Sequence, residues 1–350
     1  MAVNPMTTRA PDSLTIYSTC PQSKDVPQAE YLRTAVRHAQ WSEEAGCAGM
    51  LLYTDNGLVD PWHLAHAVMA HTDRLAPLVA VQPIYMHPYW VAKQIASLAF
   101  LHGRKVALNM LAGGFRNDLL ALGDDTPHDD RYVRTAEYTR IITGLLEGRA
   151  PVTLDGRYYR VTNLTLAPAL PESLFPDILI SGSSDAGLEA ARTIGATAIR
   201  YPKPAEQEVG EADLAGVACG VRVGIIARDT ADRAWRVAAE RFPATRQGAV
   251  LHRLATAVSD SVWHRQLSDL EERPAGPDSP YWLGPFRNYK TFCPYLVGTY
   301  EDVATELARY IAKGHRTVIL DISPSAAEFE HINTAFDLAL NKVSHAQAAA

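Results

Sequence analysis

Short apolar segments alternate along this chain with longer segments in which apolar residues recur at helical spacing. Eight of the short segments are rich in β-forming residues and predict strands that begin at residues 14, 50, 75, 105, 177, 197, 221 and 317. Most of them are apolar on both faces, which is typical of parallel strands covered on both sides. The periodic segments predict helices over residues 28–46, 61–71, 90–102, 129–148, 183–195, 230–242 and 301–314.

Eight strands that alternate with helices predict an α/β fold of the (β/α)8 TIM-barrel class, formed by residues 1–350 as a single domain with insertions. An open, doubly wound sheet is the alternative, but no glycine fingerprint follows the first strand. Two stretches interrupt the alternation. Residues 149–176 predict an excursion with a short hairpin, and residues 244–296 are irregular, with a mobile loop expected at about 274–295.

Composition excludes several classes of function. The net charge of −6 lacks the basic excess of a nucleic-acid-binding protein. No apolar stretch approaches the ~20 residues that cross a membrane, and the polar N-terminus lacks the apolar core of a signal peptide. The four cysteines form no CxxC pair, and His63 and His66 lie outside any H-E-x-x-H motif. We therefore expect a cytoplasmic protein with reduced thiols and no metal site.

The strongest chemical signal is the segment ISGSSDAGLEAA at residues 180–191, where a predicted strand ends in Ser181-Gly182-Ser183-Ser184 and a helix follows at once. The active site of a (β/α)8 barrel lies at such strand ends. Helical N–H groups, serine hydroxyls and the positive end of the helix dipole converge there, which favours phosphate binding. An ordinary serine N-cap explains the same residues, so this segment alone leaves both interpretations open.

Two further segments carry polar residues at predicted strand or helix ends. Asn109 lies inside an apolar strand, and a buried amide needs partners, so it either ties the barrel together or meets the edge of a ligand. Asp130, Arg131 and Tyr132 start a helix, where Tyr132 is placed to reach a phosphate or a ring edge. The alternative for this motif is a capped, salt-bridged helix start.

These segments, with HDDRY, LLEG, DGRYYRV, GVRVGIIARDT and YLVGTYEDVATEL, occur in an order that resembles the alkanesulfonate monooxygenase branch of the bacterial luciferase-like flavin monooxygenases. The resemblance covers about residues 28–330. It implies a (β/α)8 barrel that binds FMN, as FMNH2, at the strand ends and receives it from a separate flavin reductase. It also implies that the cofactor is held by Asn109, Tyr132, Ser181, Gly182, Ser183 and Ser184.

The same resemblance assigns Arg222 to the catalytic site, where it meets the substrate. The surrounding pocket departs from the branch. Leu58 stands in place of a cysteine, Gly224 of a histidine and Ser323 of a tyrosine, and the loop arginine is replaced by Tyr289, with Arg287 and Lys290 close by. Loss of the histidine is expected to leave space, so we predict a bulkier substrate than a short alkanesulfonate, with a polar or anionic group near Arg222.

We therefore expect a two-component monooxygenase that oxidises a small organic substrate with FMNH2 and O2. Closure of the loop at 274–295 would exclude water, and Trp282 would cap the pocket. A deazaflavin (F420)-dependent oxidoreductase of the same fold and a non-catalytic flavin-binding partner subunit are the alternatives. We also expect a homo-oligomer, either a dimer or a tetramer.

Overall fold

The computed structural model describes residues 14–270 and 279–348, the side chains of residues 257 and 258 excepted. Eight strands carry the fold: β1 (Thr15–Thr19), β2 (Gly49–Leu52), β3 (Ala76–Val81), β4 (Ala107–Met110), β7 (Ile178–Ser181), β8 (Thr197–Arg200), β9 (Cys219–Arg228) and β12 (His315–Leu320). Their hydrogen-bonded order, β9-β12-β1-β2-β3-β4-β7-β8 with a further β9–β8 pairing, is that of a closed (β/α)8 barrel. These are the eight strands that the sequence predicts, so the predicted fold class is confirmed.

The chain comprises two compact units. Unit 1 consists of Met1–Thr19, Glu44–Cys47 and Ile199–Ala350, and unit 2 of Cys20–Glu43 and Ala48–Ala198. The formation of a single domain stays a prediction.

In unit 2, the parallel strands β2, β3, β4 and β7 pair in sequence order. Its main helices are α1 (Gln28–Glu44), α2 (Pro61–His71), α3 (Pro88–His102), α5 (His128–Glu147) and α6 (Asp185–Ile194), joined by the short α4 (Arg116–Ala121). Gly103 ends α3 with φ 64°, and Gly148 ends α5 with φ 62°. Glycine adopts this left-handed conformation without a steric penalty, which explains why the apolar periodicity stops at these positions.

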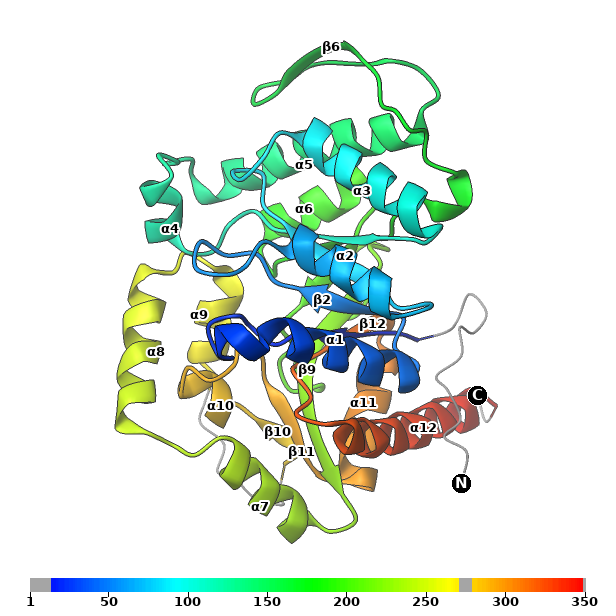
Figure 1. Cartoon of the computed structure of the whole chain (residues 1–350). Coiled ribbons are helices and arrows are strands. Elements are labelled where there is room, and N and C mark those ends of the chain that lie inside the picture. Colours follow the sequence, from blue (N-terminus) through cyan, green and yellow to red (C-terminus); the bar gives the residue numbers. More distant parts are fainter. Residues whose placement is uncertain (1–13, 271–278, 349–350) are drawn as a thin grey trace. The chain divides into compact units, whose positions relative to one another are not determined.

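The excursion at 149–176 contains the predicted hairpin, formed by β5 (Val152–Asp155) and β6 (Arg160–Leu164), and a 3-10 turn, η1 (Glu172–Leu174). Figure 1 shows the hairpin outside α5. The Glu137 carboxylate of α5 accepts backbone N–H groups from Arg157, Tyr158 and Tyr159 at 2.9, 2.8 and 3.1 Å. A Cβ at Gly156 would lie 2.4 Å from Glu137 Oε2, so the turn needs glycine there.

In unit 1, β9 lies between β12 and a further parallel strand, β11 (Tyr295–Thr299), and β10 (Tyr281–Trp282) pairs with β11 in antiparallel orientation. The accompanying helices are α7 (Ala231–Arg241), α11 (Tyr300–Ala312) and α12 (Ala326–Ala348). The long helix α12 is not predicted from the sequence. A capping box of Thr299 and Asp302 begins α11.

The prediction of irregular structure over residues 244–296 is wrong. This stretch contains α8 (Arg246–Val258), α9 (Val262–Ser268) and α10 (Gly284–Arg287), which lie beside one another in Figure 1, as well as β10 and the first residues of β11. The apolar periodicity is misleading because Val250, Leu251 and Leu254 of α8 are exposed. Of the predicted mobile loop, residues 274–278 lie outside the described residues, and its mobility stays a prediction.

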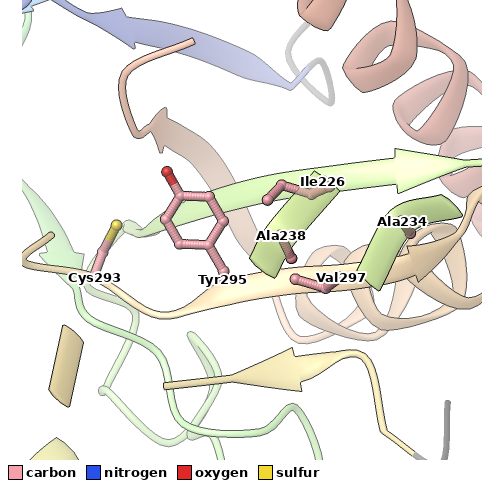
Figure 2. Packing of buried hydrophobic residues seen from close by; sticks show 6 residues of the cluster. All are labelled: Ile226, Ala234, Ala238, Cys293, Tyr295 and Val297. Atoms are coloured by element: carbon pink, nitrogen blue, oxygen red, sulfur yellow. The ribbon is translucent and has the colours of Figure 1, made fainter. Parts of the chain in front are cut away.

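One core cluster of unit 1 joins α7 to β9 and β11. Figure 2 shows the Tyr295 ring between Cys293 and Ala238, with its hydroxyl directed away from the cluster. Trp282 packs at the edge of this cluster, with its ring centroid 5.5 Å from Trp235 and 6.3 Å from that of Phe242. These aromatic contacts support the indole, and the expectation that Trp282 caps a pocket stays a prediction.

All four cysteines are buried free thiols, as predicted. Burial raises the pKa of the Cys20, Cys47 and Cys219 thiols to about 12, so they are protonated and unreactive at neutral pH. Within the described ranges, no helix has the length and apolar composition that crossing a membrane requires. In the same ranges, no three His, Cys, Asp or Glu side chains gather as metal ligands would.

Candidate active site

The junction of β7 and α6 in unit 2 has the features of a phosphate site. Ser184 is the N-cap of α6, and its hydroxyl accepts the N–H of Gly187 at 3.1 Å. The Ser183 hydroxyl is buried and has no hydrogen-bond partner among the described residues. A buried hydroxyl without a partner is costly, and here it lies at the positive end of a helix dipole. The two serines thus differ: Ser184 caps the helix, and the Ser183 hydroxyl has no partner among the described residues.

Tyr132 of α5 lies against the same junction. A Cβ at Gly182 would be 2.4 Å from the Tyr132 hydroxyl, and one at Gly187 would be 3.2 Å from the ring carbon Cε1. Both glycines therefore provide room for this buried phenol. The neighbours of Tyr132 have structural roles: Arg131 donates to the carbonyls of Thr126 and Gly113 at 3.0 and 3.2 Å.

Asn109 joins this group from β4. Its side chain is 3% exposed, and its Oδ1 accepts the Ser181 hydroxyl at 2.9 Å. Asn109 is in register with Ala80 of β3 and Leu179 of β7, which places its side chain on the same face of the sheet as theirs. Asn109, Tyr132 and residues 181–184 are thus brought together at the carboxyl ends of β4 and β7.

A cavity of about 240 Å³ opens at the carboxyl ends of β2 and β3 in the same unit. Its lining includes Ala80, Leu58, Gln82 and Tyr85. Ala80 is the register neighbour of Asn109, so this cavity lies next to Asn109. Leu58 lines this cavity, and its place in a substrate pocket stays a prediction. Burial raises the pKa of Tyr85 to about 12, so its phenol stays neutral.

In unit 1, Arg222 lies on β9 and is 5% exposed. Its Nη2 is 4.0 Å from Asp321 Oδ1, and its guanidinium carbon is 6.0 Å from the centroid of the Tyr201 ring. Tyr201 in turn stacks on Trp263 at 3.8 Å. Burial raises the pKa of Tyr201, and the nearby Arg222 opposes this rise. The cation therefore lies between a carboxylate and an aromatic wall.

The space expected beside Arg222 at Gly224 is not open. Gly224 pairs in register with Tyr295 of β11, and a Cβ at Gly224 would be 2.2 Å from ring carbon Cζ. The Tyr295 hydroxyl donates to Asp321 Oδ2 at 2.8 Å. The inference that loss of a histidine leaves a larger pocket is therefore wrong, because the neighbouring strand fills the position with a phenol.

Sequence reasoning missed Asp321. It follows directly after the apolar strand β12, and a carboxylate at the carboxyl end of a barrel strand is the signal that would have found it. The predicted Ser323 lies two residues further on. Its hydroxyl is buried and has no partner among the described residues.

For Arg287 and Lys290, two of the predicted substrate-pocket residues, the described contacts do not indicate substrate binding. Arg287 of α10 donates to the backbone carbonyl of Leu270, and the Lys290 side chain is exposed. Their place in a substrate pocket stays a prediction.

The strand order defines a (β/α)8 barrel, and comparison with known proteins places the chain among the monooxygenases. The chain belongs to the luciferase-like monooxygenase family, whose model matches residues 13–317. It is 36% identical over 309 residues to the 4-(gamma-L-glutamylamino)butanoyl-[BtrI acyl-carrier protein] monooxygenase BtrO of Niallia circulans, covering 87% of this chain and 90% of that protein.

Two solved structures show the same fold. Riboflavin lyase RcaE, with modified FMN and riboflavin, matches with a TM-score of 0.71 and 16% identity, covering 97% of this chain and 93% of that chain. An F420-dependent secondary alcohol dehydrogenase, in complex with an F420-acetone adduct, matches with a TM-score of 0.64 and 15% identity, covering 93% and 99%.

Proposed function

We propose that this monooxygenase is a two-component enzyme that takes FMNH2 from a separate flavin reductase and uses O2 to oxidise an acyl group carried by a carrier protein. The observation that supports the flavin is the buried Ser183 hydroxyl, which lacks a partner among the described residues at the start of α6. FMN carries a phosphate, and a phosphate accepts hydrogen bonds from such a hydroxyl and from helical N–H groups.

The residues of unit 2 fit this cofactor. Ser183 and the first turn of α6 would hold the phosphate, next to the Tyr132 hydroxyl. Asn109, which Ser181 orients through its hydrogen bond, would meet a polar edge of the flavin ring. Reduced FMN supplies the oxygen-activating chemistry when bound. The protein's own residues would orient the cofactor and exclude water.

The substrate class is proposed from the relative in Niallia circulans. Its name describes an acyl chain on a carrier protein that ends in a γ-glutamyl group. A γ-glutamyl group is attached through its side-chain carboxyl, so its α-amino and α-carboxyl groups are free. Arg222 is a buried cation at a strand end, and it would bind an anionic group of this kind through charged hydrogen bonds.

The test is incorporation of labelled oxygen. The chain is incubated with FMN, NADH, a flavin reductase, ¹⁸O2 and carrier-bound 4-(γ-glutamylamino)butanoate, and the acyl group is analysed by mass spectrometry. We expect a mass increase that depends on both the reductase and oxygen. Absence of labelled product, with folded protein and reduced flavin both verified, would contradict the proposal.

A deazaflavin cofactor is the second candidate, since an F420-dependent dehydrogenase shares the fold. Deazaflavin transfers hydride and does not activate oxygen. Anaerobic oxidation of an alcohol with coenzyme F420, together with no reaction with FMN, would favour it.

The proposal also includes where the protein works and how it assembles. The free thiols fit a reducing cytoplasm. The exposed Trp90, Phe100 and Leu101 of α3 fit a homo-oligomer, and light scattering measures that state.

A further inference from the structure

Asp321 is a buried carboxylate whose two oxygens are used unequally. It is 8% exposed, and Oδ2 accepts the Tyr295 hydroxyl at 2.8 Å. Oδ1 lies 4.0 Å from Arg222 Nη2, which is beyond hydrogen-bond distance. The Oδ1 oxygen therefore keeps acceptor capacity beside the arginine proposed for the substrate.

Two other buried ion pairs in unit 1 show what a purely structural pair looks like in this protein. Arg228 and Glu328 form two hydrogen bonds, at 3.1 and 2.8 Å. Arg200 donates to Glu208 at 2.8 Å. Direct contact of this kind is needed because burying two charges costs several kcal/mol per ion. The wider spacing of Arg222 and Asp321 is thus unusual within the unit.

A second polar group at the end of β12 also lacks a partner among the described residues. The Ser323 hydroxyl is 4% exposed and makes no hydrogen bond there. Buried hydroxyls normally have partners, so an unsatisfied one two residues along the chain from an incompletely used carboxylate is a second observation that points to a ligand.

We propose that Asp321 binds the ammonium group of a zwitterionic substrate terminus while Arg222 binds its carboxylate, with Ser323 donating a further hydrogen bond. An α-amino acid terminus carries both charges on one carbon, so two adjacent protein charges of opposite sign match it. This inference rests on the proposed function for the acyl chain and adds the residues that select its end. A substrate terminus that lacks the ammonium group would leave the Asp321 carboxylate with Arg222 as its one positive neighbour among the described residues of this site.

Tyr295 is a positioning residue for this site. Its hydroxyl fixes Oδ2, and Gly224 leaves the room in which its ring is held. Fixing one oxygen orients the other, so loss of the phenol hydroxyl weakens ammonium selection without removing the negative charge.

The test compares two pantetheine thioesters that differ only in the ammonium group: 4-(γ-glutamylamino)butanoyl and 4-(glutarylamino)butanoyl. Calorimetric titration of the FMN-bound protein measures both dissociation constants. We expect the wild type to prefer the amino compound by about 10- to 100-fold, as a charged hydrogen bond implies. Asp321→Asn is expected to bring the ratio close to one and Tyr295→Phe to lower it partly. Asp229→Asn removes an exposed carboxylate of unit 1 and keeps the wild-type ratio.

Equal binding of the two thioesters by the wild type, or no binding of either, overturns the inference, as does an Asp321→Asn protein that keeps the preference. Tyr295→Phe, whose fold is checked by its thermal melt, keeps the test informative if Asp321→Asn fails to fold. Selective binding with no labelled-oxygen product refutes the proposed function and leaves the ammonium site standing.

Discussion

The Tyr295 ring lies where a side chain at Gly224 would stand, with Cζ 2.2 Å from an added Cβ. The two residues face each other because β11 and β9 pair in register at this point. The pairing of the two strands thus places the Tyr295 phenol of β11 in the space that Gly224 leaves on β9.

The first prediction concerns this pair. Gly224→Ala is expected to lower the free energy of unfolding by about 1–3 kcal/mol, because the methyl group overpacks a buried ring. Adding Tyr295→Leu removes the ring, so the alanine should cost less in that background. A double-mutant cycle from denaturant unfolding measures the coupling. Additive effects would show that the ring does not limit position 224.

The second prediction separates the two serines. Ser183→Ala removes a hydroxyl proposed to meet the phosphate, so FMN should bind about 10- to 100-fold more weakly while riboflavin binding stays unchanged. Ser184→Ala instead removes the N-cap of α6 and should lower stability by about 0.5–2 kcal/mol. Fluorescence titration with both flavins measures the first effect. Equal losses for FMN and riboflavin in Ser183→Ala would refute the phosphate assignment.

The third prediction concerns the hairpin. Glu137→Gln replaces one carboxylate oxygen with an NH2 group, which cannot accept, and leaves one uncharged oxygen for the N–H groups of Arg157, Tyr158 and Tyr159. Hydrogen–deuterium exchange at these three amides should therefore accelerate, by an amount equivalent to about 1–3 kcal/mol of local stability. Glu147→Gln, at the exposed end of α5, is the matched control. Unchanged exchange in Glu137→Gln would show that the carboxylate does not hold the turn.

The sequence predicts the residues assigned to the flavin better than those around Asp321. The flavin-side residues were predictable because Ser181-Gly182-Ser183-Ser184 is contiguous and follows a strand. Asp321 has a signal in the sequence, a carboxylate directly after a strand, but its contact with Tyr295 has none, because that contact depends on the pairing of β11 with β9. The unequal roles of Ser183 and Ser184 likewise cannot be predicted from the sequence. The Ser184 hydroxyl caps the helix, whereas the Ser183 hydroxyl has no partner among the described residues.

The fourth prediction is a pH dependence of stability from the stacked pair His252 and His264, whose rings lie 5.2 Å apart. Burial lowers the pKa of His264 to about 4, with His252 adding to the shift, and burial with Arg287 nearby lowers that of His252. Between pH of about 6.5 and 4 the unfolded chain binds protons that the folded protein does not. Stability should therefore fall as pH drops through this window, by about 3 kcal/mol from His264.

His38, with a pKa lowered to about 4 by burial, contributes in the same direction. His264→Gln should thus flatten part of the pH profile of urea unfolding but not all of it. His63→Gln, at an exposed position, should leave the profile as in the wild type. A His264→Gln profile that overlays the wild type would show that this imidazole is not the titrating group.

The last prediction concerns the substrate and Arg222. Arg222→Lys keeps the positive charge but loses the planar pair of donors, and Arg222→Ala loses both. The apparent KM for carrier-bound 4-(γ-glutamylamino)butanoate should rise by an amount equivalent to about 1.5–3 kcal/mol in Arg222→Ala and by less in Arg222→Lys. FMN binding should persist in both, since the residues assigned to the phosphate lie on β7 and α6. Because Arg222→Ala also removes the cation paired with the buried Asp321, its stability should fall, and Arg222→Ala with Asp321→Asn should recover part of that loss. Short alkanesulfonates should give little or no product with the wild type, because Tyr295 occupies the position beside Arg222 that a histidine would hold and Asp321 repels a second anion. Efficient desulfonation, or an Arg222→Ala enzyme with full kcat/KM, would show that the substrate is bound elsewhere.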